Sequence, residues 1–421
     1  MKKIRSYLSN LLGNRFLRSV SVLVGGTAFA QVIAIAALPV LTRLYTPDDF
    51  GVLAIYTAIL SILISIACFR FEIAIPIPRD DNTAIDLLIL ALLGVLVSTV
   101  FVSFMLYVLA ASFNELTDSK LESYLWLLPV GVILSGCYSA FQYWMTRSNG
   151  FKLIARTRIN QSISGTGVQV GLGVLGVAPM GLLMGQILQS GAGAIMLAKS
   201  FFAKDSRLLE SVTIPRLKDT FRQYDKFPKL STLEALANSG SIHIPVIMIG
   251  ASIAGAEAGF LMLAMRLLSA PMSLIGGAVG QVYLVEAAKK YDEGELKAFT
   301  LKTVRSLCKV GFPPLLFAGA IAPFLIPFIF GEAWTKVGMI ISWMAPWFFI
   351  QFITSPVSMS LHIAGNQKAA LALQIFGLLF RVLAVFSASL YMSEWVAEIY
   401  SVSGFVFYVI YLCVVLFLLR K

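Results

Sequence analysis

Charged residues are scarce in this chain, and so are the residue types that usually build metal or redox centres. Asp, Glu, Lys and Arg make up 13% of the 421 residues, whereas a soluble domain carries about 25%. There are two histidines, far apart in the sequence, and four cysteines without a CxxC spacing. We therefore expect neither a zinc site nor a disulfide framework, and we interpret the cysteines as buried thiols.

Catalytic and nucleotide-binding motifs are also missing. The sequence contains no Ser-His-Asp set, no Walker motif and no glycine fingerprint that follows a strand. Each polar segment is too short to fold as a separate extramembrane domain. We therefore expect a protein that is not an enzyme and binds no cofactor and no metal. Nucleic acid is not an expected partner either, because the net charge of +11 is divided among short loops.

Apolar residues dominate what remains, at 58% of the chain. A membrane-spanning helix needs roughly 20 of them in succession. The sequence predicts an all-α membrane protein of about twelve transmembrane helices, arranged in two six-helix lobes around a central cavity. The predicted spans are 20–42, 50–70, 84–112, 122–146, 154–177, 180–203, 229–253, 256–286, 304–330, 336–362, 368–391 and 394–419.

The positions of lysine and arginine predict the orientation of these spans. Nearly all of them fall in every second gap between apolar stretches, and Arg158 is counted among these loop charges. Cytoplasmic loops collect Lys and Arg because their translocation is disfavoured. This pattern predicts that both termini are cytoplasmic. The exceptions are Arg43, Lys120, Lys336 and two arginines within spans.

A basic segment at the midpoint, 204–228, divides the chain and contains two prolines. It predicts a cytoplasmic linker between an N-terminal lobe at 20–203 and a C-terminal lobe at 229–421. Residues 1–19 alternate apolar and basic side chains at helical spacing, which indicates an amphipathic segment on the cytoplasmic membrane surface. Two lobes of equal span number are typical of duplicated transporter folds.

The two arginines within spans, Arg266 and Arg381, are the main candidates for substrate binding. Each lies near the predicted midplane, where an arginine costs about 2.5–3.5 kcal/mol on insertion scales. No acidic residue lies one turn away from either. Ser273 shares a helix face with Arg266, and Gln374 shares one with Arg381. The alternative is a structural arginine in a helix–helix seam.

Uncharged polar residues in other spans extend this candidate site. Gln31 and Gln142 lie centrally in the first half and Asn238 lies in span seven, although single glutamines also serve as helix–helix hydrogen bonds. Glu234 is the candidate for binding a coupling cation, or else an interfacial residue. We identify no midplane charge in the first half of the chain.

Two runs of sequence resemble motifs of bacterial polysaccharide flippases. One is Leu38-Pro-Val-Leu-Thr-Arg-Leu-Tyr-Thr-Pro-Asp-Asp-Phe-Gly-Val-Leu-Ala54, and the other is Arg70-Phe-Glu-Ile-Ala-Ile-Pro-Ile-Pro78. The stretch from Ala264 to Leu268, with the later Pro271 and Gly280-Gln-Val282, is similar to span eight of that family. With the layout of spans, the resemblance covers nearly the whole chain.

The resemblance implies a member of the multidrug, oligosaccharidyl-lipid and polysaccharide exporter superfamily in the bacterial inner membrane. It implies transfer of an undecaprenyl-diphosphate-linked glycan, such as an O-antigen repeat of lipopolysaccharide, to the periplasmic leaflet by alternating access. The implied partners are membrane lipid, a coupling proton or sodium ion, and a polysaccharide polymerase complex. A cationic cavity in that family suits Arg266 and Arg381.

Three other functions stay open at this point. A cation-coupled multidrug exporter of the same superfamily would need an acidic residue deep in the N-terminal lobe, where the sequence has none. A flippase for the peptidoglycan lipid precursor would share the mechanism with a different cargo. A membrane-embedded glycan polymerase or ligase typically needs a large periplasmic loop, which the sequence does not show.

Overall fold

The computed structural model describes residues 15–116, 121–252 and 255–419. Within these ranges the chain forms helices and no strands, which confirms the all-α prediction. The predicted amphipathic segment at 1–19 lies mostly outside the described residues and stays a prediction.

The chain divides into two compact units. Unit 1 comprises Met1–Ala37, Leu60–Glu115 and Glu122–Ala235, and unit 2 comprises Leu38–Ile59, Leu116–Leu121 and Leu236–Lys421. The segment 204–228 therefore belongs to unit 1, and the helix Pro47–Ala67 is divided between the units. The lobe boundaries 20–203 and 229–421 stay predictions.

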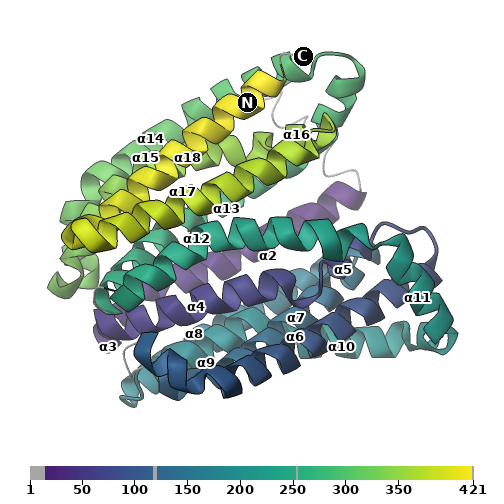
Figure 1. Cartoon of the computed structure of the whole chain (residues 1–421), viewed down its shortest axis with the longest axis horizontal. Coiled ribbons are helices and arrows are strands. Elements are labelled where there is room, and N and C mark those ends of the chain that lie inside the picture. Colours follow the sequence, from purple (N-terminus) through teal and green to yellow (C-terminus); the bar gives the residue numbers. More distant parts are fainter. Residues whose placement is uncertain (1–14, 117–120, 253–254, 420–421) are drawn as a thin grey trace. The chain divides into compact units, whose positions relative to one another are not determined.

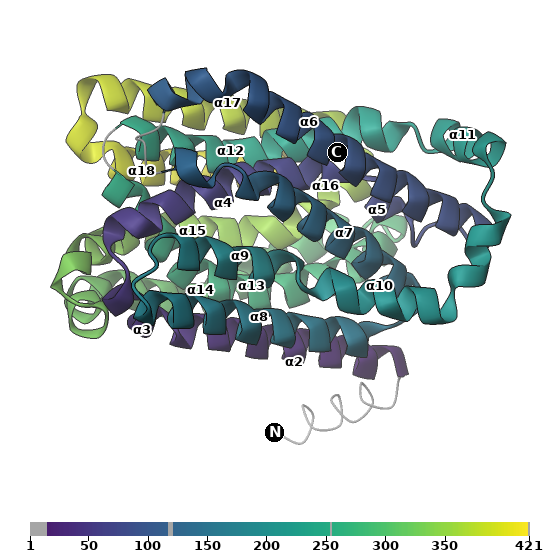
Figure 2. The same cartoon turned by 90° about the horizontal axis from the view of Figure 1, so that it is seen from below.

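Unit 1 is built from long helices that run side by side, as α2 and α8 do in Figure 2. Two short 3-10 helices in the described part of unit 1 lie before α7 and before α11, where polar residues interrupt the apolar sequence. The helices are α2 (Arg15–Ala36), the end of α4 (Pro47–Ala67), α5 (Phe71–Ala74), α6 (Asp81–Leu116), α7 (Leu127–Arg147), α8 (Phe151–Val174), α9 (Met180–Gly191), α10 (Gly193–Lys204) and α11 (Ile214–Gln223), followed by the first residues of α12 (Thr232–Ser252).

Small residues allow these helices to approach closely, as they do in many membrane bundles. A Cβ atom on Gly165 of α8 would lie 2.6 Å from the carbonyl oxygen of Gly185 on α9. A Cβ atom on Gly26 of α2 would lie 2.6 Å from the Cβ atom of Ala155 on α8. Side chains larger than hydrogen at either glycine would force these helices apart.

Unit 2 is also built from long helices that run side by side. Figure 1 shows α15, α17 and α18 side by side in it. Its helices are α3 (Leu38–Leu44), the start of α4, the main part of α12, α13 (Gly255–Asp292), α14 (Leu296–Phe330), α15 (Thr335–Val357), α16 (Met359–Ile363), α17 (Gln367–Tyr391) and α18 (Val396–Leu418). Trp334, just before α15, donates from its indole nitrogen to the Thr42 carbonyl of α3 at 3.1 Å.

Four prolines lie inside α14, and one of them explains a contact with α15. Pro323 has no N–H group, so the carbonyl of Gly319, four residues earlier, loses its helical donor. The Ser342 hydroxyl on α15 donates to that carbonyl at 2.6 Å. The neighbouring helix thus satisfies the acceptor that the proline leaves free.

Eight helical segments of the described residues are long and apolar enough to cross a membrane. They begin at Ser21, Pro47, Asp81, Met180, Leu296, Glu332, Lys368 and Ser393. A multi-pass membrane protein is thereby established. The count of twelve spans and the cytoplasmic position of the termini stay predictions.

Candidate functional site

A polar pocket lies inside unit 1, among α2, α7, α8 and α9. Its volume is about 300 Å³. Two of the residues predicted to bind substrate, Gln31 and Gln142, line it together. Its other lining residues are Thr27, Ala30, Ala34, Tyr138, Arg158, Gln161, Ser162 and Gln189.

Two hydrogen bonds join α2 and α8 at this pocket, and a third lies within α2. The Ser162 hydroxyl donates to the Ala30 carbonyl at 2.6 Å. The Arg158 guanidinium donates to Oγ1 of Thr27 at 2.7 Å, and the Thr27 hydroxyl donates to the carbonyl of Leu23 at 2.8 Å. The close approach of the two helices at Gly26 makes these short bonds possible, so the pocket side chains are held in defined positions.

Arg158 places a positive charge at the pocket of unit 1, where we expected none. We counted it among the cytoplasmic loop charges, but α8 begins at Phe151, so Arg158 lies two turns inside the helix. At 1.5 Å per residue, it lies about 10 Å from that end of the helix. Its spacing from Gln161 and Ser162, three and four residues later, places all three on one helix face. That polar face was the signal in the sequence.

Amide groups supply most of the remaining polarity. Gln161 is almost fully buried, and its Nε2 donor has no hydrogen-bond partner among the described residues. Nε2 of Gln189 donates to Oε1 of Gln169 at 3.3 Å, and the Tyr138 hydroxyl lies 3.4 Å from Oγ1 of Thr157. The pocket therefore offers a free buried N–H group in addition to its arginine.

The charge of the pocket lining narrows the class of ligand. The lining contains one arginine and neither aspartate nor glutamate. Guanidinium groups match the geometry of phosphate and carboxylate groups. Glutamine amides can both donate hydrogen bonds to hydroxyl groups and accept hydrogen bonds from them. A cationic ligand would meet a like charge here. The pocket is suited to a ligand that carries an anion, hydroxyl groups or both.

Arg381 lies in unit 2 and is fully buried on α17. Its guanidinium carbon is 4.4 Å from the ring centroid of Trp347 on α15 and 4.8 Å from that of Tyr400 on α18. None of its three guanidinium nitrogens makes a hydrogen bond within the described part of the chain. The cation is held between two aromatic faces, which attract it through their ring quadrupoles.

The other predicted residues occupy separate places. Arg266, on α13, is partly buried and adjoins Leu267, which lines an apolar pocket of about 110 Å³. Gln374 lies two turns before Arg381 on α17, and its Oε1 is buried without a partner among the described residues. Asn238 is exposed on α12.

Two predicted residues remain. Ser273 belongs to α13, but its side chain lies outside the described residues. Glu234 is partly buried at the start of α12, in the last residues of unit 1. Of the predicted set, the structure therefore brings Gln31 and Gln142 into one pocket, and their role in binding stays a prediction, as does that of the others.

Solved structures with a similar fold are transporters. The chain resembles a multidrug resistance MATE family transporter of the MOP superfamily at 15% identity and a TM-score of 0.68, covering 93% of this chain and 96% of the other. It resembles lipid II flippase MurJ at 14% identity and a TM-score of 0.67, covering 95% and 87%. It also resembles a MOP superfamily transporter from Pyrococcus furiosus at 14% identity and a TM-score of 0.55, covering 98% of each chain. At these identities the likeness establishes the fold.

The sequence of the chain matches the model of one protein family. No curated protein matches the chain. A family model described as "Polysaccharide biosynthesis protein" matches residues 40–339, which is most of the chain. The match includes the quoted run from Val40 to Ala54 and the run from Arg70 to Pro78, and it confirms the resemblance to polysaccharide flippases. The chain belongs to the polysaccharide biosynthesis protein family and has the fold of MOP superfamily transporters.

Proposed function

We propose that this protein moves an undecaprenyl-diphosphate-linked oligosaccharide, such as an O-antigen repeat unit, from the cytoplasmic to the periplasmic leaflet of the inner membrane. The polysaccharide biosynthesis family and the transporter fold support a flippase. The observation that carries the choice of cargo is the pocket of unit 1, which combines Arg158 with several glutamine amides and has no carboxylate in its lining.

The chemistry of this cargo matches the pocket in two respects. A diphosphate linkage is anionic and suits the guanidinium group of Arg158. Sugar hydroxyls both donate and accept, as the amides of Gln31, Gln142 and Gln161 do. The same lining disfavours a cationic drug, because such a ligand requires an acidic partner in the membrane.

Membrane potential supplies a driving force for this direction of transfer. One elementary charge that crosses 100 mV gains or loses about 2.3 kcal/mol. Because the cytoplasm is negative, export of a diphosphate with two net negative charges would release roughly 4–5 kcal/mol of free energy at a potential of 100 mV. A coupling proton or sodium ion, for which Glu234 is the candidate, would add to this gain.

The first experiment is depletion of the protein in its native host, followed by mass spectrometry of lipid-linked intermediates in each leaflet. Complete glycan repeats are expected to accumulate on the cytoplasmic leaflet. Accumulation of the peptidoglycan lipid precursor would assign the other flippase activity. Normal intermediates together with increased drug sensitivity would refute the proposal in favour of drug export.

A second experiment tests the pocket itself. Arg158→Gln is expected to slow flipping about 10- to 100-fold, because a charge-assisted hydrogen bond contributes about 1.5–3 kcal/mol. Arg158→Lys keeps the charge and should retain more activity. The matched control is Arg156→Gln, which removes the same charge from an exposed position on the same helix. Equal effects of the two Gln variants on flipping would show that the pocket does not bind the transported molecule.

A further inference from the structure

The segment between α10 and α12 is held against unit 1 by a buried ion pair. Asp86, in the second turn of α6, is 1% exposed. The Arg216 guanidinium on α11 donates to its Oδ2 from Nη2 at 2.8 Å and from Nε at 3.1 Å. The Thr220 hydroxyl, one turn later on α11, donates to the same oxygen at 3.2 Å. These bonds fix which face of α11 is turned toward α6.

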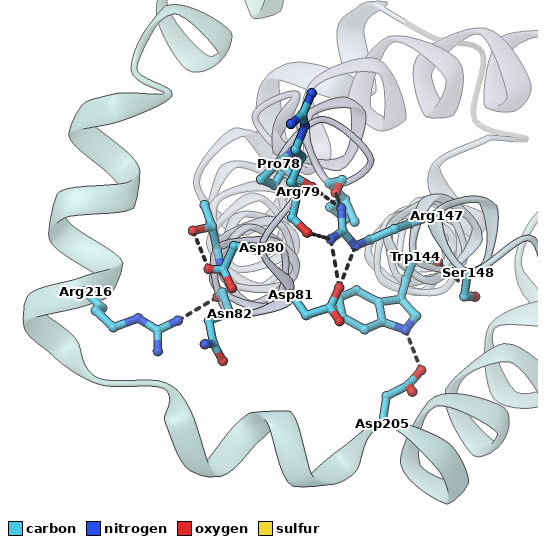
Figure 3. A network of polar contacts seen from close by, with 12 residues as sticks. Pro78, Arg79, Asp80, Asp81, Asn82, Trp144, Arg147, Ser148, Asp205 and Arg216 are labelled. Carbon is cyan, nitrogen blue, oxygen red and sulfur yellow. Dashed lines mark hydrogen bonds and ion pairs between the residues drawn. The ribbon is translucent and has the colours of Figure 1, made fainter.

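Further contacts fix the segment along its length, some of them drawn in Figure 3. Arg216 also donates to the Asn82 carbonyl at 2.6 Å. Near the end of α10, Asp205 accepts a hydrogen bond of 2.8 Å from the Trp144 indole on α7. The ring centroid of Phe221 on α11 lies 5.6 Å from that of Phe71 on α5. The segment is therefore a part of unit 1 with a defined outer surface.

Apolar and basic side chains share that outer surface, and the acidic Asp219 beside Lys218 is exposed there as well. Successive helical residues are separated by about 100°, so Ile214, Lys218 and Arg222 lie on the face of α11 opposite Arg216 and Thr220. Ile214 is 83% exposed, and Lys218 and Arg222 are exposed. The exposed cations Arg207 and Lys226 precede and follow α11 in the chain, and none of these four basic residues forms an ion pair in the part of the chain that the structure describes. We name the set Arg207, Ile214, Lys218, Arg222 and Lys226 the α11 surface.

The position of α11 along the helix α6 indicates which part of the membrane the α11 surface contacts. Asp86 lies five residues from the start of the span Asp81–Val108, which is about 8 Å at 1.5 Å per residue. The helix that pairs with it is therefore placed beside the end of a membrane span, at the level of lipid headgroups. A single exposed isoleucine is normal on a protein surface in water and by itself indicates no ligand. It is favourable where the side chain reaches the acyl boundary and the cations meet anionic lipid.

We propose that the α11 surface binds anionic phospholipid headgroups, with Ile214 inserted beneath them. The ion pair of Arg216 with Asp86 presents this surface to the membrane in one orientation. The lipid is recognised by the charge of its headgroup, and a phosphatidylglycerol molecule has the required chemistry. This binding is independent of the transported cargo.

The test uses the full-length protein in vesicles of equal parts phosphatidylglycerol and phosphatidylcholine. A photo-crosslinking amino acid replaces Ile214, and mass spectrometry identifies the adducts. We expect phospholipid adducts with phosphatidylglycerol in clear excess. The matched control is the same amino acid at Gln223, which is exposed on the opposite side of α11 and should give few lipid adducts.

Charge variants test the preference for anionic lipid. In the Lys218→Gln, Arg222→Gln variant, the ratio of phosphatidylglycerol to phosphatidylcholine adducts should fall roughly fivefold for each cation removed. The exchange Lys218→Arg, Arg222→Lys keeps the charge and should keep the ratio. Equal lipid adducts at positions 214 and 223, or a ratio unchanged by the Gln variant, would overturn the proposal. Ile214 adducts to a protein in native membranes, with none to lipid in vesicles, would assign the surface to a protein partner instead.

Discussion

Replacing Arg381 with methionine should leave the protein at least as stable as before. Burial of an ion costs several kcal/mol, which is normally recovered by hydrogen bonds and a counter-ion. Arg381 is fully buried, and within the described residues its nitrogens make no hydrogen bond. Its two aromatic contacts, at 4.4 and 4.8 Å, contribute about 2 kcal/mol each when desolvated. The free energy that the two aromatic contacts contribute is therefore similar in size to the free energy that burial of the charge costs.

Methionine fills a similar length without the charge and keeps favourable sulfur–aromatic contacts of about 0.3–1.5 kcal/mol. We expect the free energy of unfolding of Arg381→Met to stay the same or to rise by about 1–2 kcal/mol, as buried ions replaced by apolar groups often show. The assay is thermal unfolding in lipid nanodiscs, where each kcal/mol shifts the midpoint by about 2 °C in a protein of this size.

A double-mutant cycle with Trp347→Leu separates the cation–π contact from the packing of the indole ring. The tryptophan substitution should cost about 0.5–1.7 kcal/mol less in the Arg381→Met background than in the native protein. The native protein loses a cation–π contact of about 2 kcal/mol, whereas the variant loses a sulfur–aromatic contact of about 0.3–1.5 kcal/mol. A loss of more than about 3 kcal/mol in Arg381→Met alone would refute this reasoning, since it would require a strong partner for the guanidinium. Loss of flipping at unchanged stability would instead assign Arg381 to transport.

Three further substitutions test other parts of the structure. Gly404→Ala should destabilise unit 2 by about 1–3 kcal/mol, because the new Cβ atom would lie 2.4 Å from the Trp347 ring; the midpoint of thermal unfolding measures this. Asp86→Ala should release α11 by leaving Arg216 without its carboxylate, so limited proteolysis should cut within 204–230 much faster than in the native protein. Ser342→Ala should cost about 1–3 kcal/mol by leaving a carbonyl of α14 without its donor, and an unchanged unfolding midpoint would contradict that assignment.

Hydropathy predicted the helices of this protein well but not their interruptions. The predicted span 20–42 is two helices, because α2 ends at Ala36 and α3 begins at Leu38. The predicted span 180–203 is likewise divided into α9 and α10 at Ala192. A hydropathy average records the preference of a segment for lipid, and it does not record where the backbone bends within that segment.

The candidate site was harder to predict, because charge counting and helix length gave conflicting answers for the same residue. Arg158 lies within the predicted span 154–177, yet we assigned its charge to the preceding loop. The choice depends on whether the long side chain reaches water or turns inward, and only the packing of α8 against Thr27 decides that. Gln31 and Gln142 were easier to select, because an amide in an apolar span requires a polar neighbour.

The contact between α14 and α15 at Ser342 has a mechanical consequence. A proline inside a helix normally creates a point of compliance, because one rung of the hydrogen-bond ladder is missing there. At Pro323 the missing hydrogen bond is replaced by one from a hydroxyl group of the adjacent helix; the other three prolines of α14 are Pro313, Pro314 and Pro327. Bending at Pro323 therefore stretches a hydrogen bond to α15, so the two helices resist bending together at this point. A force that bends α14 at Pro323 is therefore passed on to α15.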